Sequence, residues 1–226
     1  MACGARRDVQ DPDERWAQRR LTAQQCMSVR RIATSRFPTK YGLFRAHAFA
    51  AADGCEHLAL VRLRLSQVRA PLVRIHSECI TGEVLGSLRC DCRAQLNESL
   101  RRIVQAGSGI LIYLRGQEGR GIGLANKIRA YALQDADHDT VSANSALGLP
   151  VDARSYAPAA AMLLELGVRR VRLLTNNPKK VSAVEAAAIV VEERVSLVAG
   201  ATVENKRYLQ AKAEKLGHLL PQNIKH

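Results

Sequence analysis

The sequence predicts an α/β protein in which a mixed β-sheet is covered by helices in a three-layer α/β/α arrangement, with an N-terminal strand meander. Two observations predict this fold class. Short apolar runs bounded by turn residues fill the first half of the chain after about residue 31. In the second half, strand-like and helix-like patterns alternate, and no internal repeat interrupts them.

The meander is predicted from three runs of alternating apolar residues, FRAHAFA, HLALVRLRL and PLVRIH, at residues 44–50, 57–65 and 71–76. Turn residues such as Asp53-Gly54 and Pro71 separate them. We therefore expect neighbouring strands joined by short loops.

The second half begins with a helix in residues 93–109, because Leu96, Leu100, Ile103 and Val104 share one helical face and Gly107 suits the C-terminal cap. The further expected elements, in chain order, are a strand at 109–115, a helix at 124–135, a loop to about 151, a helix with Pro158 in its first turn that ends at Gly167, a strand at 168–175, a short helix after NNPKK, a strand within 191–200 and a helix within 205–220.

The expected domain organisation is simple. Residues 1–30 are polar and form a partly disordered N-terminal extension with a short helix around Glu14–Gln25, residues 31–222 form one domain, and residues 223–226 are a tail. No apolar run approaches the roughly 18 residues of a membrane span, and the N-terminus lacks the apolar core of a secretory signal. We expect a cytoplasmic protein with no membrane partner.

The chain has 34 basic and 21 acidic residues, a net charge of +13. Such a charge suits nucleic acid or a small polyanion such as a nucleotide. Basic runs with interleaved aromatic residues are absent from the sequence, and Lys and Arg recur beside glycines and at strand ends. This distribution favours the small polyanion, with no nucleic-acid partner.

The segment HSECITGEVLGSLRCDC, residues 76–92, carries three of the six cysteines. Cys90 and Cys92 point to the same side in extended backbone, and Cys79 is positioned to approach them after the intervening loop. Cys92 also lies at an expected helix start, where the helix dipole favours a thiolate. The spacing favours a zinc site over buried structural thiols.

The sequence allows two forms of the zinc site. His76 would make a closed structural site as a fourth ligand, but on a strand that includes Cys79 it points to the opposite face. Three thiolates with one position left for water, the arrangement of catalytic zinc, are preferred.

A glycine-rich loop, RGQEGRGIG, lies between an expected strand and an expected helix. Such loops bind anions through backbone N–H groups, although a plain tight turn explains this one equally well. Arg115 and Arg120 supply bidentate donors for phosphate or a carbonyl oxygen, and Glu118 can accept from the N–H groups of guanine.

LLTNNPKK repeats this arrangement. Thr175 ends a strand, and Lys179 and Lys180 follow within one turn, as at the ligand crevice of open α/β sheets; a solvated lysine pair is the alternative. Asp152 and Arg154, on their chemistry alone, are explained by a local ion pair or a helix cap.

Five segments follow one another along the chain in this order: RIHSECITGEVLGSLRCDC, RGQEGRGIGLANKIRAYALQD, DAR, RLLTNNPKK and KAEKLGHLL. Together they resemble the GTP cyclohydrolase II family over about residues 31–222. The resemblance implies that Cys79, Cys90 and Cys92 bind one zinc ion per chain. It implies catalytic roles for Asp152 as proton acceptor, Arg154 as nucleophile and Tyr131 in completing the hydrolysis. The GTP-binding residues that it implies are Arg74, Ile75, His76, Ser77, Glu78, Gln95, Glu118, Gly119, Arg120, Thr140, Thr175 and Lys180.

The family reaction converts GTP into 2,5-diamino-6-ribosylamino-4(3H)-pyrimidinone 5′-phosphate, formate and pyrophosphate, with Zn²⁺ and Mg²⁺, and opens riboflavin biosynthesis. The resemblance also implies a homodimer. A guanidinium is almost always protonated and is then a poor nucleophile. A role for Arg154 as a phosphate clamp is therefore kept as the alternative to its role as nucleophile. Tyr131 and His76 are the candidates for a proton shuttle.

The sequence departs from the family pattern at Arg93, where glycine is usual, at Ser142, where an acidic residue is usual, and at Gly116, which lengthens the loop. Arg93 could alter the turn behind the thiolates. Two other functions are therefore kept: a paralogue that supplies the same or a formylated intermediate to a secondary-metabolite pathway, and a nucleotide- or nucleic-acid-binding protein with structural zinc.

Overall fold

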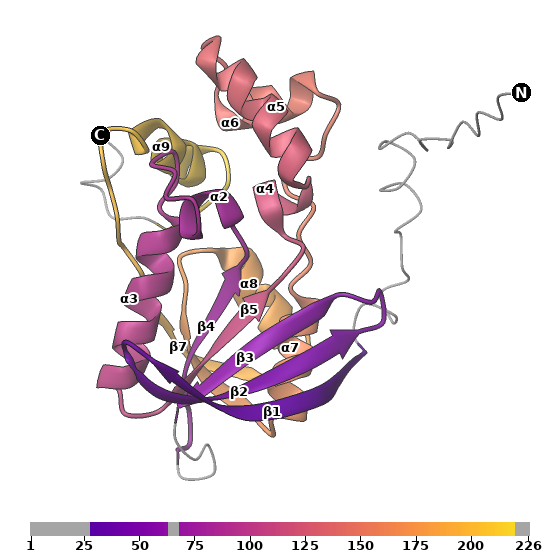
Figure 1. Cartoon of the computed structure of the whole chain (residues 1–226), viewed down its shortest axis with the longest axis vertical. Helices are drawn as coiled ribbons and strands as arrows, with labels where there is room; N and C mark the ends of the chain where they lie inside the picture. Colours follow the sequence, from indigo (N-terminus) through magenta and orange to yellow (C-terminus); the bar gives the residue numbers. More distant parts are fainter. Residues whose placement is uncertain (1–27, 63–67, 220–226) are drawn as a thin grey trace, which may run out of the picture.

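The computed structural model describes residues 28–62 and 68–219 (Figure 1). The helix expected around Glu14–Gln25 and the tail 223–226 lie outside these residues.

One seven-stranded mixed sheet runs through the molecule in the order β1-β2-β3-β5-β4-β6-β7. The strands are β1 (Val29–Thr39), β2 (Gly42–Ala51), β3 (Glu56–Arg62), β4 (Leu72–Ser77), β5 (Gly109–Leu114), β6 (Arg170–Leu174) and β7 (Val190–Val195). β1, β2, β3 and β5 pair antiparallel, whereas β5, β4, β6 and β7 pair parallel. The N-terminal meander and the mixed sheet are both confirmed.

The helices are α2 (Ile80–Glu83), α3 (Cys92–Gln105), α4 (Glu118–Gly121), α5 (Leu124–Asp135), α6 (Thr140–Ala146), α7 (Ala157–Glu165), α8 (Pro178–Glu185) and α9 (Lys206–Glu214). α3 covers one face of the sheet, and α7 and α8 cover the other (Figure 1). The fold therefore has the three layers that the sequence predicted. None of the helices among the described residues is long and apolar enough to cross a membrane.

Each face of the sheet has its own aliphatic core. Ile75, Ile112 and Leu173 pack with Met162 and Leu163 of α7 on one side, all with 0% exposure. On the other side, Leu111 and Leu174 pack against Ile103 of α3. Alternate residues of the parallel strands face opposite layers, which explains why these strands read as continuous apolar runs.

Four elements were not predicted: α2 and α4, which lie in segments expected to be loops, and α6 and β1. α6 lies in the segment expected to be a loop, and its residues TVSANSA carry little apolar pattern. The sequence signal that could have revealed α6 is its N-cap residue, Asp139. The Asp139 side chain accepts hydrogen bonds from the backbone N–H groups of Val141 and Ser142. The strand β1 was also missed, because nine of its eleven residues are exposed and it has no buried face to generate alternation.

The carboxyl ends of the central parallel strands meet at one edge of the sheet. β4 lies between β5 and β6, so the chain leaves β4 toward one side and later returns to its other side. Crevices of this kind are the usual ligand sites of open α/β sheets. Residues that follow these strand ends are therefore brought together, although they lie far apart in the sequence.

Candidate active site

Three cysteine thiols converge beyond the end of β4. Cys79 precedes α2, Cys90 lies in the next loop, and Cys92 begins α3. Their sulfur atoms all lie within 4.8 Å of one another, and the Sγ atoms of Cys79 and Cys90 are 3.7 Å apart. The predicted convergence is confirmed, including the place of Cys92 at a helix start.

Gly82 packs directly against the three converging cysteines. A Cβ atom at this position would lie 2.5 Å from the Cys90 Sγ and 3.3 Å from the Cys79 Sγ. Any side chain at residue 82 would therefore enter the space that the three sulfur atoms face. Among the described residues, the ligating group contains only these three side chains, which is the donor set of an open zinc site.

His76 is turned away from the thiols. Its Nε2 lies 2.8 Å from Glu83 Oε1, and its ring stacks on Tyr113, whose hydroxyl donates to the other oxygen of Glu83 at 2.7 Å. Burial lowers the pKa of His76, so the ring is neutral near pH 7. The structure therefore agrees with the preference for three thiolates over a closed site with His76.

Lys127 of α5 is a site residue that sequence reasoning missed. Its Nζ lies 3.1 Å from Cys79 Sγ, 2.6 Å from Thr81 Oγ1 and 2.5 Å from Glu118 Oε1. Burial opposes the charge, but Cys79, Tyr131 and Glu118 together raise the pKa of Lys127 above its usual value. An ammonium group at this distance stabilises the thiolate form of Cys79. Nothing in the sequence around Lys127 marks it as a site residue, because a lysine in a helix is usually solvated.

Tyr131 lies one helical turn after Lys127 and faces the thiols from α5. The guanidinium of Arg89 lies over its ring, 4.8 Å from the centroid, and the Lys127 ammonium lies 5.6 Å from it. Arg89 also bonds the carbonyl of Tyr131 and the carboxylate of Asp135. These contacts join the cysteine loop to α5 and fix the ring that is predicted to complete the hydrolysis.

Two cavities meet at this edge of the sheet. The first, which we call the thiol cavity, is lined by Ser77, Glu78, Cys79, Cys90, Cys92, Gln117, Gly119, Arg120, Ile122, Lys127, Ala130, Tyr131, Gln134, Thr140, Asn144, Arg154 and Tyr208. The predicted residues Tyr131, Thr140, Gly119 and the three cysteines therefore surround one space.

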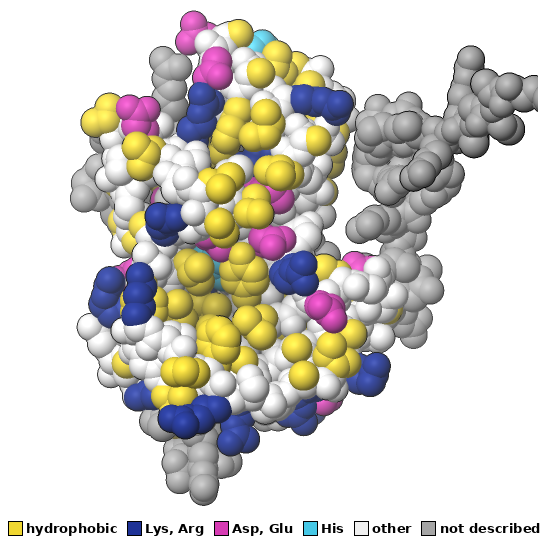
Figure 2. Space-filling view, in the orientation of Figure 1, with side chains coloured by type: hydrophobic (Ala, Val, Ile, Leu, Met, Phe, Trp, Pro, Cys, Tyr) yellow, Lys and Arg dark blue, Asp and Glu magenta, His cyan; other side chains and the backbone are white. Residues whose placement is uncertain are grey.

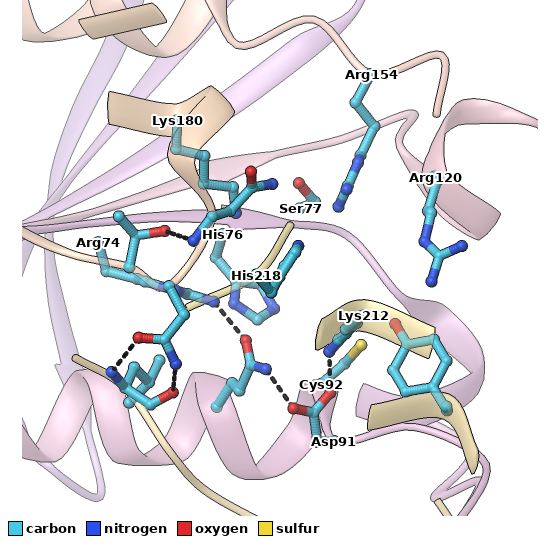
Figure 3. A pocket seen from close by; sticks show the side chains of 16 residues that line it. Arg74, His76, Ser77, Asp91, Cys92, Arg120, Arg154, Lys180, Lys212 and His218 are labelled. Carbon is cyan, nitrogen blue, oxygen red and sulfur yellow. Dashed lines mark hydrogen bonds and ion pairs between the residues drawn. The ribbon is translucent and has the colours of Figure 1, made fainter. Parts of the chain in front are cut away.

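The second, which we call the basic cavity, is lined by Arg74, His76, Ser77, Asp91, Cys92, Gln95, Arg120, Arg154, Thr175, Asn176, Asn177, Lys180, Leu197, Tyr208, Lys212 and His218 (Figure 3). Five of these side chains are lysines or arginines and one is an aspartate. Arg120 and Arg154 line both cavities, so one ligand can extend from the thiols into the basic region. This electrostatic field favours a polyanion.

Arg74 and Gln95 belong to a buried polar chain along the floor of the basic cavity (Figure 3). Arg74 donates to the Leu174 carbonyl at 3.0 Å and to Gln95 Oε1 at 2.6 Å. The amide of Gln95 then donates to Asp91, which also accepts from Lys212 at 2.6 Å. Burial lowers the pKa of Arg74 to about 10, so it remains charged at neutral pH.

Thr175 directly follows β6, and Lys180 lies in the first turns of α8, close after that strand end as the sequence predicted. The Lys180 Nζ donates to the carbonyl of Ile75 at 2.9 Å and lies 5.1 Å from the Tyr156 ring. Burial, followed by the charges of Arg74 and Arg154, lowers the pKa of Lys180 well below its usual value. An anion in the basic cavity would therefore relieve an unfavourable charge. Lys179, by contrast, is 64% exposed and lines neither cavity, although its Nζ lies 3.9 Å from Asp152 Oδ2.

Asp152 and Arg154 form a buried bidentate ion pair. Arg154 Nε and Nη2 each lie 2.8 Å from a different oxygen of Asp152. Burial alone would favour the neutral forms of both groups. The hydrogen bonds and opposite charges of the pair have the larger effect, so the pKa of Asp152 is lowered and the pKa of Arg154 is raised. The pair that the bare chemistry favoured is thus present, and it lies at the junction of the two cavities.

Arg120 has unusual geometry. It follows Gly119, and both residues are left-handed, with φ of 67° and 61°. Left-handed backbone is strained in an arginine and is typical of functional sites. It turns the guanidinium inward, where neither Nη1 nor Nη2 has a hydrogen-bonding partner among the described residues.

Other buried polar atoms without a partner also belong to cavity residues. In the described part of the chain they include Arg74 Nε, His76 Nδ1 and Gln117 Oε1. Buried polar groups are nearly always hydrogen-bonded, so a cluster of unsatisfied donors and acceptors around one space indicates that a polar ligand completes them.

Three predicted binding residues are engaged in holding the site together. Glu118 accepts from the Ile80 N–H at 2.5 Å and pairs with Lys127, and Glu78 accepts from the Gly116 N–H at 2.7 Å. The Ile75 side chain lies in the core, and only its carbonyl takes part, through Lys180. Arg115 lines neither cavity and is 54% exposed beside Glu56 and Glu78.

Comparisons with known proteins decide the family. The sequence profile described as GTP cyclohydrolase II matches residues 30–196, well over half of the chain. The chain belongs to the GTP cyclohydrolase II family. It is 53% identical over 191 residues to a GTP cyclohydrolase-2 of Neisseria meningitidis serogroup C / serotype 2a, a match that covers 84% of this chain and 96% of the relative.

Longer proteins match as well. The riboflavin biosynthesis protein RibBA of Salinispora arenicola is 51% identical over 205 residues, 90% of this chain and 48% of that protein. Among solved structures, a two-domain 3,4-dihydroxy-2-butanone 4-phosphate synthase from A. baumannii is 18% identical, with a TM-score of 0.44 over 76% of this chain and 40% of its own.

The departures from the GTP cyclohydrolase II pattern leave the thiols in place. Arg93 is helical within α3, and its guanidinium donates to the carbonyls of Glu83 at 3.0 and 2.8 Å and of Val84 at 2.9 Å. It therefore caps the end of α2 rather than altering the turn. Ser142 lies in the first turn of α6, where its hydroxyl donates to the Asp139 carbonyl at 3.1 Å.

Proposed function

We propose that this protein hydrolyses GTP by opening the imidazole ring of the guanine, and that it releases formate and pyrophosphate and leaves 2,5-diamino-6-ribosylamino-4(3H)-pyrimidinone 5′-phosphate. This is the first step of riboflavin biosynthesis. The observation that carries the proposal is that the thiol cavity and the basic cavity share lining residues, Arg120 and Arg154 among them, so that a candidate metal site and a polyanion site lie side by side. Membership in the GTP cyclohydrolase II family supports it independently.

In this proposal the guanine lies in the thiol cavity and the triphosphate in the basic cavity. Lys180, Arg120 and Arg154 bind the phosphate oxygens, and Thr175 lies beside them at the end of β6. Mg²⁺ bound to the phosphate chain would neutralise part of its charge. Gln117, whose Oε1 has no partner among the described residues, is available to a base N–H group.

Cys79, Cys90 and Cys92 would hold one Zn²⁺, which would supply an acidified water for hydrolysis of the guanine ring. The protein supplies the remaining groups. Tyr131 faces the same space from α5, and burial raises its pKa, so its phenol carries a proton at neutral pH and can donate it to a ring nitrogen. His76 is held by Glu83 on the side of the basic cavity, which favours Tyr131 as the proton shuttle.

We assign Arg154 to phosphate binding. Its pKa is raised through the bonds to Asp152 and Asp152 remains ionised, so a neutral guanidinium, which a nucleophile requires, is strongly disfavoured. Asp152 then serves to orient Arg154. If a covalent step does occur, Asp152 is the group placed to accept the proton, with the Arg154 Nε 2.8 Å away.

The test is product analysis. Purified protein is incubated with GTP, Mg²⁺ and Zn²⁺, and the products are identified by mass spectrometry, with formate and pyrophosphate measured separately. We expect one formate and one pyrophosphate per ribosylaminopyrimidine. A product that keeps the formyl group would instead indicate the paralogue that supplies a formylated intermediate. Unchanged GTP together with salt-dependent RNA binding would indicate the nucleic-acid-binding alternative.

A homodimer is the assembly that we propose. β1 is an exposed edge strand, and Ile32, Phe37 and Leu43 on β1 and β2 are each at least 40% exposed. Figure 2 shows apolar side chains gathered on the lower part of this face among lysines and arginines. An uncovered edge strand is a site for pairing with another chain. Light scattering after size exclusion tests this, and a monomer at micromolar concentration would contradict it.

We further propose that the protein works in the cytoplasm.

A further inference from the structure

The segment after β7 forms one wall of the basic cavity, although the family profile ends at residue 196. Leu197, Tyr208, Lys212 and His218 all line this cavity. Figure 3 shows His218 and Lys212 among the side chains from β4, α3 and α8. The proposed GTP-binding residues all precede this segment, so nothing above assigns His218 a role.

His218 is held in place by backbone bonds on both sides. Its N–H donates to the Lys212 carbonyl at 3.0 Å, and the next N–H, of Leu219, donates to the carbonyl of Asn176 at 2.9 Å. Asn176 follows β6 and is itself a lining residue of the basic cavity. The backbone that carries His218 is therefore anchored to α9 and to the end of β6, and the imidazole lines the same cavity as Lys180 and Thr175.

The surroundings of His218 are strongly cationic. Lys212 reaches it from α9, Arg154 from the loop before α7, Lys180 from α8 and Arg120 from α4. Burial, followed by these four charges, lowers the pKa of His218 to about 3. The ring is therefore neutral in the ligand-free protein. In the described residues no hydrogen bond is made by its nitrogen atoms, so both are available to a ligand.

We propose that His218 is a further substrate-binding residue, which donates a hydrogen bond to the phosphate chain of GTP and takes up a proton from solvent as the nucleotide binds. The inference rests on the proposed function. The neutral imidazole lies among four of the basic side chains of this cavity, and an anion bound there would favour its charged form. The negative charges of a triphosphate oppose the field of Lys212, Arg154, Lys180 and Arg120, so they favour the imidazolium, which is the stronger donor.

A contact with the triphosphate can be distinguished from a contact with the rest of the nucleotide by comparing the affinities for nucleotide and nucleoside. A residue that contacts phosphate affects the affinity for the nucleotide and leaves the affinity for the nucleoside unchanged. A residue that only supports the fold affects both. The proton provides a second signature, because Gln in place of His keeps an N–H donor but cannot ionise.

The experiment is titration calorimetry of the zinc-loaded protein with 7-deaza-GTP and with 7-deazaguanosine, which lack the N7 atom of the bond to be hydrolysed. Each titration is made near pH 6.5 in two buffers of different ionisation enthalpy, so that proton uptake is measured directly. The variants are His218→Gln and His218→Leu. His138→Gln is the matched control, because His138 is an exposed histidine outside both cavities.

We expect 7-deaza-GTP to bind His218→Leu about tenfold or more weakly than wild type, the loss of one charge-assisted hydrogen bond. Proton uptake should fall in both His218 variants. Affinity for 7-deazaguanosine should not change. Equal proton uptake in wild type and His218→Gln, or an equal loss for the nucleoside, would overturn the inference.

The outcomes also distinguish this inference from the proposed function. If wild-type protein binds neither 7-deaza-GTP nor GTP, the proposed function fails. If wild-type protein binds 7-deaza-GTP and releases formate from GTP while the His218 variants do the same with unchanged affinity, only the role of His218 fails. Should His218→Leu not fold, His218→Gln alone decides through the proton count.

Discussion

Lys212 of α9 donates a hydrogen bond to Asp91, 2.6 Å away, and Asp91 is the residue between two of the three convergent thiols. Both side chains are less than 10% exposed. Burial would favour the neutral carboxyl, but Lys212 and Gln95 keep the pKa of Asp91 below its usual value. The contact ties the C-terminal helix to the cysteine loop, so the two parts of the site depend on each other.

Removing this contact should destabilise the protein. In Lys212→Met the carboxylate of Asp91 stays buried and loses its charged partner, which costs about 3 kcal/mol in comparable pairs. Urea unfolding of the zinc-loaded protein measures the loss. Lys215→Met is the control, because Lys215 pairs with Asp139 at a surface where both side chains are more than 35% exposed and the cost is at most about 1 kcal/mol. Equal losses in the two variants would contradict the buried pair.

Cys90→Ser should abolish ring opening by removing zinc. A hydroxyl is a poor substitute for a thiolate ligand, and the remaining two sulfur atoms cannot complete the site. Metal content by atomic spectrometry and formate release are measured together. Cys55→Ser lies outside the cluster and should keep both. Full formate production in Cys90→Ser would remove the metal hypothesis.

Lys127→Met should weaken zinc binding, because it deletes the ammonium 3.1 Å from Cys79 Sγ. The loss of an outer contact of this kind typically costs 10- to 100-fold in metal affinity. Competition with a chromogenic chelator gives the affinity without reference to turnover. Lys127→Arg keeps the charge and should lie between wild type and Lys127→Met. A methionine variant that holds zinc as tightly as wild type would show that the contact serves only packing.

Arg154→Lys keeps a positive charge but loses the two-pronged bond to Asp152. If Arg154 clamps phosphate, KM for GTP should rise about tenfold and kcat should change little, because ground-state and transition-state binding are both reduced. Steady-state kinetics with formate detection separate the two constants. Loss of kcat by several orders of magnitude at unchanged KM would instead favour a covalent role.

The free energy of unfolding should fall as the pH drops below about 6.5. The pKa values of His47, His57, His76 and His218 are all lowered, in each case mainly by burial, so the unfolded chain binds protons that the folded protein does not. One such proton corresponds to about 1.4 kcal/mol per pH unit. The carboxylates follow at lower pH, since the pKa of Asp139 is lowered to about 2, chiefly by Lys215.

Urea unfolding at pH 8, 7, 6 and 5 measures this slope, and His218→Gln should reduce it whereas His138→Gln should not. An identical slope in His218→Gln would mean that His218 is protonated in the folded protein.

Much of the fold follows from local patterns. The helix expected at residues 124–135 has those bounds in α5, and the strand at 109–115 differs from β5 by one residue. The thiols were predicted because their spacing is itself the signal. Lys127, Tyr208 and Lys212 were missed because each acts through a partner distant in sequence, and a lysine gives no local indication that it is buried. His218 lay within a segment that contributed to the family resemblance, but no chemistry was assigned to it.

The placement of His218 and Tyr208 has a consequence for biosynthesis of the protein. The three cysteines leave the ribosome more than a hundred residues before His218 does. The nascent chain can therefore collect its metal while the basic cavity still lacks one wall. If nucleotide binds as proposed, its full set of contacts exists only after translation has passed α9. In the proposed function, metal loading could therefore precede nucleotide capture during maturation.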